Sequence, residues 1–249
     1  MISYFQAEIK KYLIELKTYY PDHLVEMIIT FFIFAILIII NKFNNSQSVY
    51  IGFIYWYLLS SLISEASVSI STEKQMGTLE QLLIKPIKFE YIILIKSLVW
   101  FLINFLKVQM IFLIIKMIFQ INLFFDFRIL LIFCISSVGI LGFTLFLVGL
   151  TLKYTKVASF ESLISYFLLF FSGAIIDDES LPKWAIFVGD ILPIKRGIQL
   201  STNIVANNHI NFIEILLFVL QAIIYFSIGF LTFNSIYLRS KDDGIDRSY

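Results

Sequence analysis

Charged residues are scarce in this sequence of 249 residues, where Asp, Glu, Lys and Arg together make up 15% of the chain. Ordinary soluble domains contain roughly 25%. Hydrophobic residues make up 59%, and phenylalanine alone occurs 27 times. A soluble domain of this length has too little interior to hide so much apolar surface. We therefore expect an integral membrane protein, with lipid in contact with much of its surface.

Cysteine, histidine and an excess of charge of one sign are also lacking. The single cysteine, Cys134, excludes a disulfide within the chain. The two histidines, His23 and His209, lie far apart in the sequence and with one cysteine make no plausible metal site. A formal net charge of +1 gives no indication of a nucleic-acid partner. We expect no metal, no cofactor and no nucleic acid to be bound by this chain.

A nucleotide-binding loop is missing as well. Such a loop has the pattern G-x-x-x-x-G-K-[ST], and no glycine in this chain is followed by lysine. No G-x-S-x-G or similar nucleophile context occurs, so no catalytic residue is expected. The sequence predicts that the chain is not an enzyme. If ATP drives it, a separate polypeptide must hydrolyse the ATP.

Long apolar runs dominate what is present. A bilayer-spanning helix needs about 20 mostly apolar residues, and six runs approach that length: Leu24–Ile40, Val49–Ile70, Tyr91–Phe119, Ile129–Leu152, Val157–Ile176 and Phe212–Leu238. The sequence therefore predicts an all-α integral membrane fold with six transmembrane helices in a single transmembrane domain, residues 1–249. Small residues in the fourth run, including Gly142 and Gly149, permit close approach of another helix. The alternative is that they make room for a substrate.

Lysine and arginine indicate the orientation of these runs. Outside the runs, most of them fall on the side that holds both chain ends and the connection at residues 72–86. Positive residues favour the cytoplasmic side of a membrane. We therefore predict that both termini and this connection are cytoplasmic.

The first 21 residues predict an amphipathic helix rather than a span. Apolar residues recur at steps of three and four from Ile2 to Tyr20, and Lys10, Lys11 and Lys17 take the other face. Pro21 is expected to break this helix. Such a helix lies flat in the cytoplasmic interface of the membrane. The alternative is a soluble helix that packs on a partner.

The connection at residues 72–86 contains the stretch EKQMGTLEQLLIKP, from Glu73 to Pro86. Thr78 followed by Gln81 fits a capping box, which is a local signal for the start of a helix. Leu79, Leu82 and Leu83 share one helical face, and Pro86 ends the helix. The pattern predicts a rigid helix of about two turns that docks into a groove of a partner. The alternative is an ordinary connecting loop.

This stretch resembles the signature E-x-x-x-G-T-L-E-x-L-x-x-x-P of the type-2 permeases of ATP-binding cassette transporters. The matching positions are Glu73, Gly77, Thr78, Leu79, Glu80, Leu82 and Pro86. The resemblance implies that the short helix is a cytoplasmic coupling helix, seated in a cleft of an ATPase subunit. Residues implied to touch the ATPase are Thr78, Leu79, Glu80, Leu82 and Leu83. Glu73 is implied to fix the loop by hydrogen bonds or an ion pair.

The segment before the last apolar run also resembles this family, through the pattern S-G…L-P-x-W…P from Ser172 to Pro193. The resemblance implies an external gate, for which the candidate residues are Asp177, Asp178, Pro182, Trp184 and Pro193. The acidic run that begins at Asp177 departs from the family pattern, in which an aromatic residue and a proline are common. Apolar residues within 177–211 predict short re-entrant helices that cap the pathway on the outside.

Ionisable residues inside the apolar runs are costly, so each needs a reason. The candidates are Glu65, Lys107 and Glu161, with Asn104 one helical turn before Lys107. One hypothesis is that Lys107 pairs across the bundle or touches a polar part of a substrate. The other is a structural ion pair, or a lysine that extends to the interface. Glu65 and Glu161 are interpreted as boundary or structural residues.

Together these features predict the membrane subunit of an ATP-driven exporter. The resemblance implies two ATPase subunits, which bind ATP and Mg²⁺, and a second permease copy, with a homodimer favoured. It also implies a bacterial plasma membrane. An apolar pathway suits an amphipathic or antimicrobial peptide first, then a drug or a lipid. Two alternatives remain: an ion-coupled secondary transporter or channel, and a toxin-immunity or sensing subunit that transports nothing.

Overall fold

The computed structural model describes residues 2–42, 48–119, 126–153, 158–173, 182–192, 194–206, 208 and 210–243. Within these ranges all regular secondary structure is helical, as the sequence predicts. The helices are α1 (Ile2–Thr18), α2 (Tyr20–Lys42), α3 (Ser48–Gln75), α4 (Leu79–Leu83), α5 (Phe89–Phe119), α6 (Phe127–Lys153), α7 (Ala158–Phe171), α8 (Lys183–Ile191), α9 (Lys195–Val205) and α10 (Phe212–Asp243).

Five of these helices, α2, α3, α5, α6 and α10, are long and apolar enough to cross a membrane. The predicted fifth span, Val157–Ile176, corresponds to α7, which has 14 residues. A helix of that length extends about 21 Å, which is less than the hydrocarbon core of a bilayer, about 30 Å. Both ends of the predicted span lie outside the described residues, so a sixth span stays a prediction.

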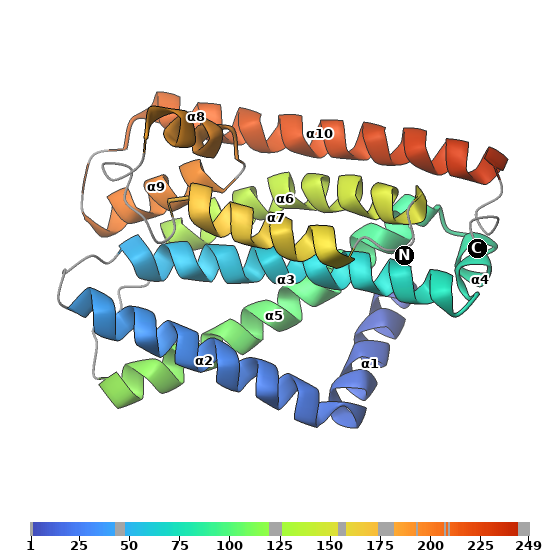
Figure 1. Ribbon diagram of the computed structural model, residues 1–249, viewed down its shortest axis with the longest axis horizontal. Coiled ribbons are helices and arrows are strands. Elements are labelled where there is room, and N and C mark those ends of the chain that lie inside the picture. Colours follow the sequence, from blue (N-terminus) through green and yellow to red (C-terminus); the bar gives the residue numbers. More distant parts are fainter. Residues whose placement is uncertain are drawn as a thin grey trace.

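The long helices form an elongated bundle (Figure 1). In this view α3, α6, α7 and α10 run in similar directions, and α5 crosses them diagonally. The short helix α4 and the C-terminal end of α10 lie at one end of the bundle, and α8 and α9 lie at the other. Helix α1 lies across the bundle direction, nearer to the end that holds α4. This arrangement places the predicted coupling helix and the predicted gate at opposite ends.

The transition from α1 to α2 differs from the prediction. Pro21 was expected to end the first helix, but α1 ends at Thr18 and Pro21 lies in the first turn of α2. Proline fits there because the N–H groups of the first helical turn have no partner within the helix. The break between the two helices therefore falls two residues before the proline.

Helices α6 and α10 are in direct backbone contact at two glycines. A Cβ atom added to Gly229 would lie 1.8 Å from the carbonyl oxygen of Gly142, and one added to Gly142 would lie 2.4 Å from the Cα of Phe226. Neither position can hold a side chain without separating the helices. The prediction that small residues of the fourth apolar run permit close helix approach is confirmed at Gly142.

Candidate functional site

The chain leaves α3 through a tight turn that leads into α4. Gly77 adopts a φ of 68°, in the left-handed region that glycine enters without steric cost. A Cβ atom at this position would meet no atom within 4 Å. The requirement for glycine is therefore set by the backbone conformation alone, and the turn reverses the chain so that α4 lies against the end of α3.

Thr78 begins α4, but not in the way that the capping box predicts. Its carbonyl oxygen accepts hydrogen bonds from the N–H groups of Gln81 (3.1 Å) and Leu82 (3.3 Å). Its hydroxyl group instead donates to the Glu73 carboxylate, over 2.5 Å. A charged acceptor makes a stronger hydrogen bond than a neutral group. The threonine therefore ties the start of α4 to the last turn of α3.

Glu73 joins two more helices, α5 and α1, to this turn. Its Oε1 lies 3.4 Å from Lys96 Nζ of α5 and 4.0 Å from Lys11 Nζ of α1. Lys96 is 1% exposed and donates in addition to Ser69 Oγ, over 3.2 Å. A buried ammonium group requires a charged partner, and Glu73 is that partner. We call Glu73, Thr78, Lys96 and Lys11 the Glu73 network.

Two further contacts hold the same end of the bundle. Lys74 Nζ donates to the carbonyl oxygen of Leu152 in α6, over 3.0 Å. Lys85, which follows α4, lies with its Nζ 5.2 Å from the ring centre of Tyr4 in α1, within the range of a cation–π interaction. Burial raises the pKa of Tyr4 to about 12, and the carboxylates of Glu8 and Glu73 add to this. The phenol therefore stays neutral at physiological pH.

The leucine face of α4 points into this chain. Leu79 is 1% exposed and Leu82 is 7% exposed, and both belong to the hydrophobic core. Their own bundle therefore covers both leucines in this structure, and the implied contact with an ATPase stays a prediction. The apolar residues that are exposed here are Met76 and Ile84, at 72% and 82%. Pro86 is exposed beyond α4, and the side chains of Glu80 and Leu83 lie outside the described part of the structure.

Lys107 forms an ion pair deeper in the bundle. Its Nζ lies 2.9 Å from Glu26 Oε2 of α2. Tyr57 of α3 donates to the other oxygen of Glu26 over 2.8 Å, and His23 Nδ1 lies 3.3 Å from Lys107 Nζ. An ion pair between two helices is part of both hypotheses for Lys107, so contact with a substrate stays a prediction. Glu26 is not among the residues predicted from the sequence, although its acidic side chain within the first apolar run is an available signal.

Glu65 lies in a second polar group, in which no cation pairs with it among the residues that the structure describes. Its Oε1 accepts hydrogen bonds from Asn104 Nδ2 of α5 (2.9 Å) and from the Tyr12 hydroxyl of α1 (3.2 Å). Burial and the nearby Glu65 carboxyl raise the pKa of Tyr12. Glu65 therefore connects α3 to α1 and α5. The side chain of Glu161 is not among those that the structure describes.

The opposite end of the bundle holds the residues predicted as a gate. Pro182 and Trp184 are present at the start of α8, while Asp177, Asp178 and Pro193 lie outside the described residues. Trp184 is 63% exposed. A Cβ atom added to Gly189 of α8 would lie 2.3 Å from the carbonyl oxygen of Phe171, so α8 abuts the end of α7. Two short helices, α8 and α9, occupy the described part of 177–211; that they are re-entrant and cap a pathway stays a prediction.

Hydrogen bonds tie α8 and α9 to the bundle. Gln221 Nε2 and the Tyr225 hydroxyl, both of α10, donate to the carbonyl oxygen of Ile191, over 3.0 Å and 2.5 Å. Lys195 of α9 is 1% exposed and pairs with Asp190 over 3.0 Å. The break between α8 and α9 is therefore held by polar groups of α10.

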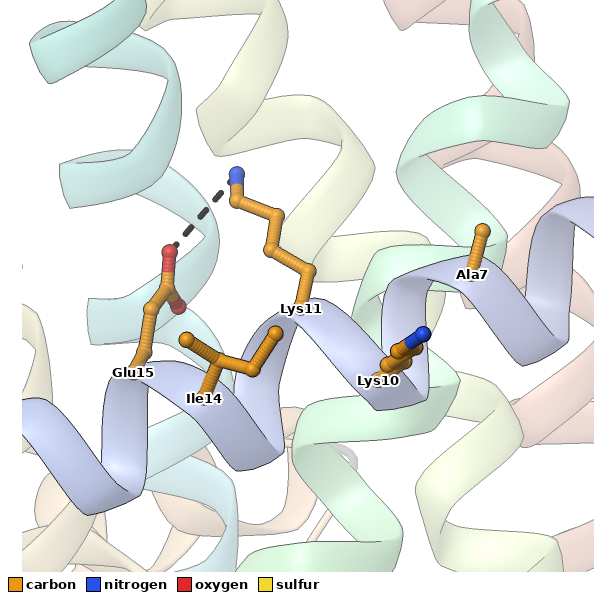
Figure 2. A pocket seen from close by; sticks show the side chains of 5 residues that line it. All are labelled: Ala7, Lys10, Lys11, Ile14 and Glu15. Atoms are coloured by element: carbon orange, nitrogen blue, oxygen red, sulfur yellow. Dashed lines mark ion pairs between the residues drawn. The ribbon is translucent and has the colours of Figure 1, made fainter.

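Two hollows of similar size lie on the surface of the described chain. One, of about 480 Å³, follows a single open face of α1 lined by Ala7, Lys10, Lys11, Ile14 and Glu15 (Figure 2). Lys11 and Glu15 form an ion pair of 3.7 Å across it (Figure 2). Another of similar size lies between α9 and α10. No group of metal-binding side chains occurs within the described ranges.

The family of the chain follows from its sequence as a whole. Residues 3–206 match a family model described as "ABC-2 type transporter". This chain belongs to the ABC-2 type transporter family. Comparison with curated proteins found no match. The matched range of this ABC-2 transporter chain includes α4 and the Glu73 network. The resemblance to type-2 permeases is confirmed, and the chain is a multi-pass membrane subunit whose family works with ATP-binding cassette ATPases.

Proposed function

We propose that this ABC-2 transporter chain is the membrane subunit of an ATP-driven exporter, and that α4 receives the mechanical input from a separate ATPase. The observation that carries this proposal is the Glu73 network. It joins the short helix to three longer ones through a single carboxylate. The ATPase, and not this chain, binds ATP and Mg²⁺.

The contacts define a route by which a force on α4 reaches the bundle. Thr78 and Glu73 connect α4 to α3, which runs from this end of the bundle to the other. Lys96 connects the same carboxylate to α5. Leu79 and Leu82 pack into the core, so α4 cannot tilt independently of the bundle. Movement of α4 is expected to move α3 and α5 as a unit.

The surface that we propose for the ATPase contact is made of the exposed residues around α4, and it differs from the set that the family resemblance implies. Met76 and Ile84 are the exposed apolar residues beside α4, and Gln81 and Lys85 are exposed next to them. An exposed apolar centre with a polar rim is typical of a docking surface. We propose that these four residues make the contact and that the buried leucines support it from within.

The remaining features of the exporter are proposed from the family and from the apolar surface. A second copy of the chain completes the pathway, and lipid covers the rest. Exposed aromatic and aliphatic residues on α7, including Leu163, Tyr166 and Phe170, are available to the second copy or to lipid. The substrate that we favour is an amphipathic peptide, and a drug or a lipid is the second choice. The end that carries α4 faces the cytoplasm of a bacterial cell.

Co-purification and ATPase measurements test this function. The chain should co-purify with an ATP-binding cassette ATPase, and an amphipathic peptide should stimulate ATP hydrolysis by the complex in liposomes. Ile84→Arg should weaken assembly or stimulation. The matched control is Ile213→Arg, since Ile213 is also exposed, at 60%, but lies at the start of α10. Activity without any ATPase would favour the ion-coupled alternative. ATPase binding without peptide stimulation would favour a subunit that transports nothing.

A further inference from the structure

Two buried oxygen atoms, one on Asn104 and one on Glu65, have no hydrogen-bond donor within the described part of the chain. Asn104 is fully buried, and its Nδ2 donates to Glu65 Oε1 over 2.9 Å. Its own Oδ1 has no hydrogen-bond partner within the described part of the chain, and the same is true of Glu65 Oε2. Both atoms can only accept hydrogen bonds if Glu65 is ionised. Buried polar atoms are rarely left in this state.

The chemistry of the two side chains supplies the missing donor. A carboxylic acid and an amide can pair through two hydrogen bonds, in which the amide N–H donates to one acid oxygen and the acid O–H donates to the amide oxygen. The first of these bonds is present. The two atoms that the second bond would join are the two without partners. Oε1 already accepts from Tyr12 as well as from Asn104, so the site for a proton is Oε2.

The charges around Glu65 lead to the same conclusion. The groups that face it are Tyr12 of α1, Asn104 and Lys107 of α5, and Glu26 of α2, with His23 and Tyr57 around Glu26. Lys107 lies 2.9 Å from Glu26, so its charge is already matched. No ion pair is found for Glu65 among the described residues. An ionised Glu65 would add an uncompensated negative charge inside the bundle, which is costly.

We propose that Glu65 holds a bound proton and forms an acid–amide pair with Asn104, while the neighbouring Glu26 stays ionised against Lys107. The carboxyl group of Glu65 is then neutral and that of Glu26 is charged, although the two lie in adjacent polar groups. The proton-binding site joins α1, α3 and α5, and α3 is the helix that ends in the Glu73 network. The proposal can be tested on the purified chain without a transport assay.

Two conservative substitutions distinguish the carboxyl groups. Glu65→Gln replaces the acid with an amide that can make the same two hydrogen bonds to Asn104, so its melting temperature in detergent should equal that of the unmodified chain. Glu26→Gln removes the charge that balances Lys107, so its melting temperature should fall. If Glu65→Gln is destabilised as much as Glu26→Gln, or fails to fold, Glu65 is ionised and the proposal is overturned.

The pH dependence adds a second readout. A proton held more tightly in the folded than in the unfolded chain stabilises the fold at low pH, and this stabilisation is lost as pH rises. Between about pH 5 and about pH 9, the melting temperature of the unmodified chain should fall more than that of Glu65→Gln. Equal falls in the two proteins would contradict the proposal.

Infrared spectroscopy of the unmodified chain detects a protonated carboxyl group directly, so this test does not rely on the stability of a variant. At neutral pH the spectrum should contain a carboxylic acid C=O band that shifts in D₂O. The band should be absent from Glu65→Gln and retained in Glu26→Gln. Absence of the band from the unmodified chain would show that Glu65 is a carboxylate whose free oxygens are satisfied by water or a cation.

Discussion

At the scale of single residues, Glu73 has the most consequential position in this chain. Its carboxylate accepts a hydrogen bond from the Thr78 hydroxyl and lies near two ammonium groups, those of Lys96 and Lys11. One of them, on Lys96, is almost fully buried. Removal of a charge from such a pair leaves the other charge in an apolar environment, which costs more than the pair itself contributes.

We therefore expect Glu73→Ala to lower the free energy of unfolding by about 3 kcal/mol. Thermal denaturation in detergent micelles measures this. The control is Glu15→Ala, which removes the other carboxylate beside Lys11; its side chain is 45% exposed. Exposed pairs of this kind contribute about 0.5 kcal/mol or less. Equal effects of the two substitutions would show that Lys96 does not depend on Glu73.

Gly77 provides a residue-scale test of backbone conformation without a change in packing. Gly77→Ala should destabilise the turn by about 1 kcal/mol, because alanine is strained at a φ of 68° while its Cβ would meet no neighbour within 4 Å. Gly77→Asn should cost less, since asparagine tolerates this region better. Thermal denaturation of the three proteins checks this order, and a larger loss for asparagine would contradict it.

At the scale of helices, the contact between α6 and α10 depends on the absence of side chains. Gly142 and Gly229 bring the two backbones together, and dispersion contacts and weak polar contacts replace the hydrophobic effect where lipid is the solvent. The sequence predicts such an approach in general terms, since glycine within an apolar run is unusual enough to notice. It cannot say which helix approaches, because Gly142 and Gly229 lie far apart in the chain, with α7, α8 and α9 between them.

Gly229→Ala should disrupt this contact. The added Cβ would lie 1.8 Å from the Gly142 carbonyl oxygen, and backbone cannot move aside as a side chain can. We expect a loss of about 3 kcal/mol or more, read from the melting temperature. Gly149→Ala is the matched control in α6, since its nearest neighbour would be the Ile236 side chain at 3.3 Å. A similar melting temperature for both variants would show that α6 and α10 can separate at little cost.

At the scale of the whole molecule, the two ends of the bundle carry different kinds of structure. One end has α4 and the Glu73 network, and the other has α8 and α9, held to α10 by Gln221 and Tyr225. The lysine and arginine distribution predicts that the end with α4 is cytoplasmic. The proposed export function needs an input at that end and an exit at the other.

Thiol labelling tests the orientation, and the single native cysteine makes it practical. In a Cys134→Ser background, Lys85→Cys should not react with a membrane-impermeant maleimide on intact bacterial cells, because it lies beside α4. Trp184→Cys in α8, at a position that is 63% exposed, should react. Both should react after the cells are broken. Labelling of Lys85→Cys in intact cells would reverse the proposed orientation.

The sequence by itself determined the properties that depend on local pattern: the helical class, five of the spans, the amphipathic first helix and the short helix after Gly77. Hydropathy, periodicity and turn chemistry act over a few residues, so they can be recognised without knowledge of the tertiary contacts. The tertiary structure alone decided what each of these elements faces. In the folded chain Leu79 and Leu82 are buried, the Thr78 hydroxyl donates to Glu73, and Lys107 forms an ion pair with Glu26. Burial and ion pairing join residues distant in the chain, and only packing determines which of them meet.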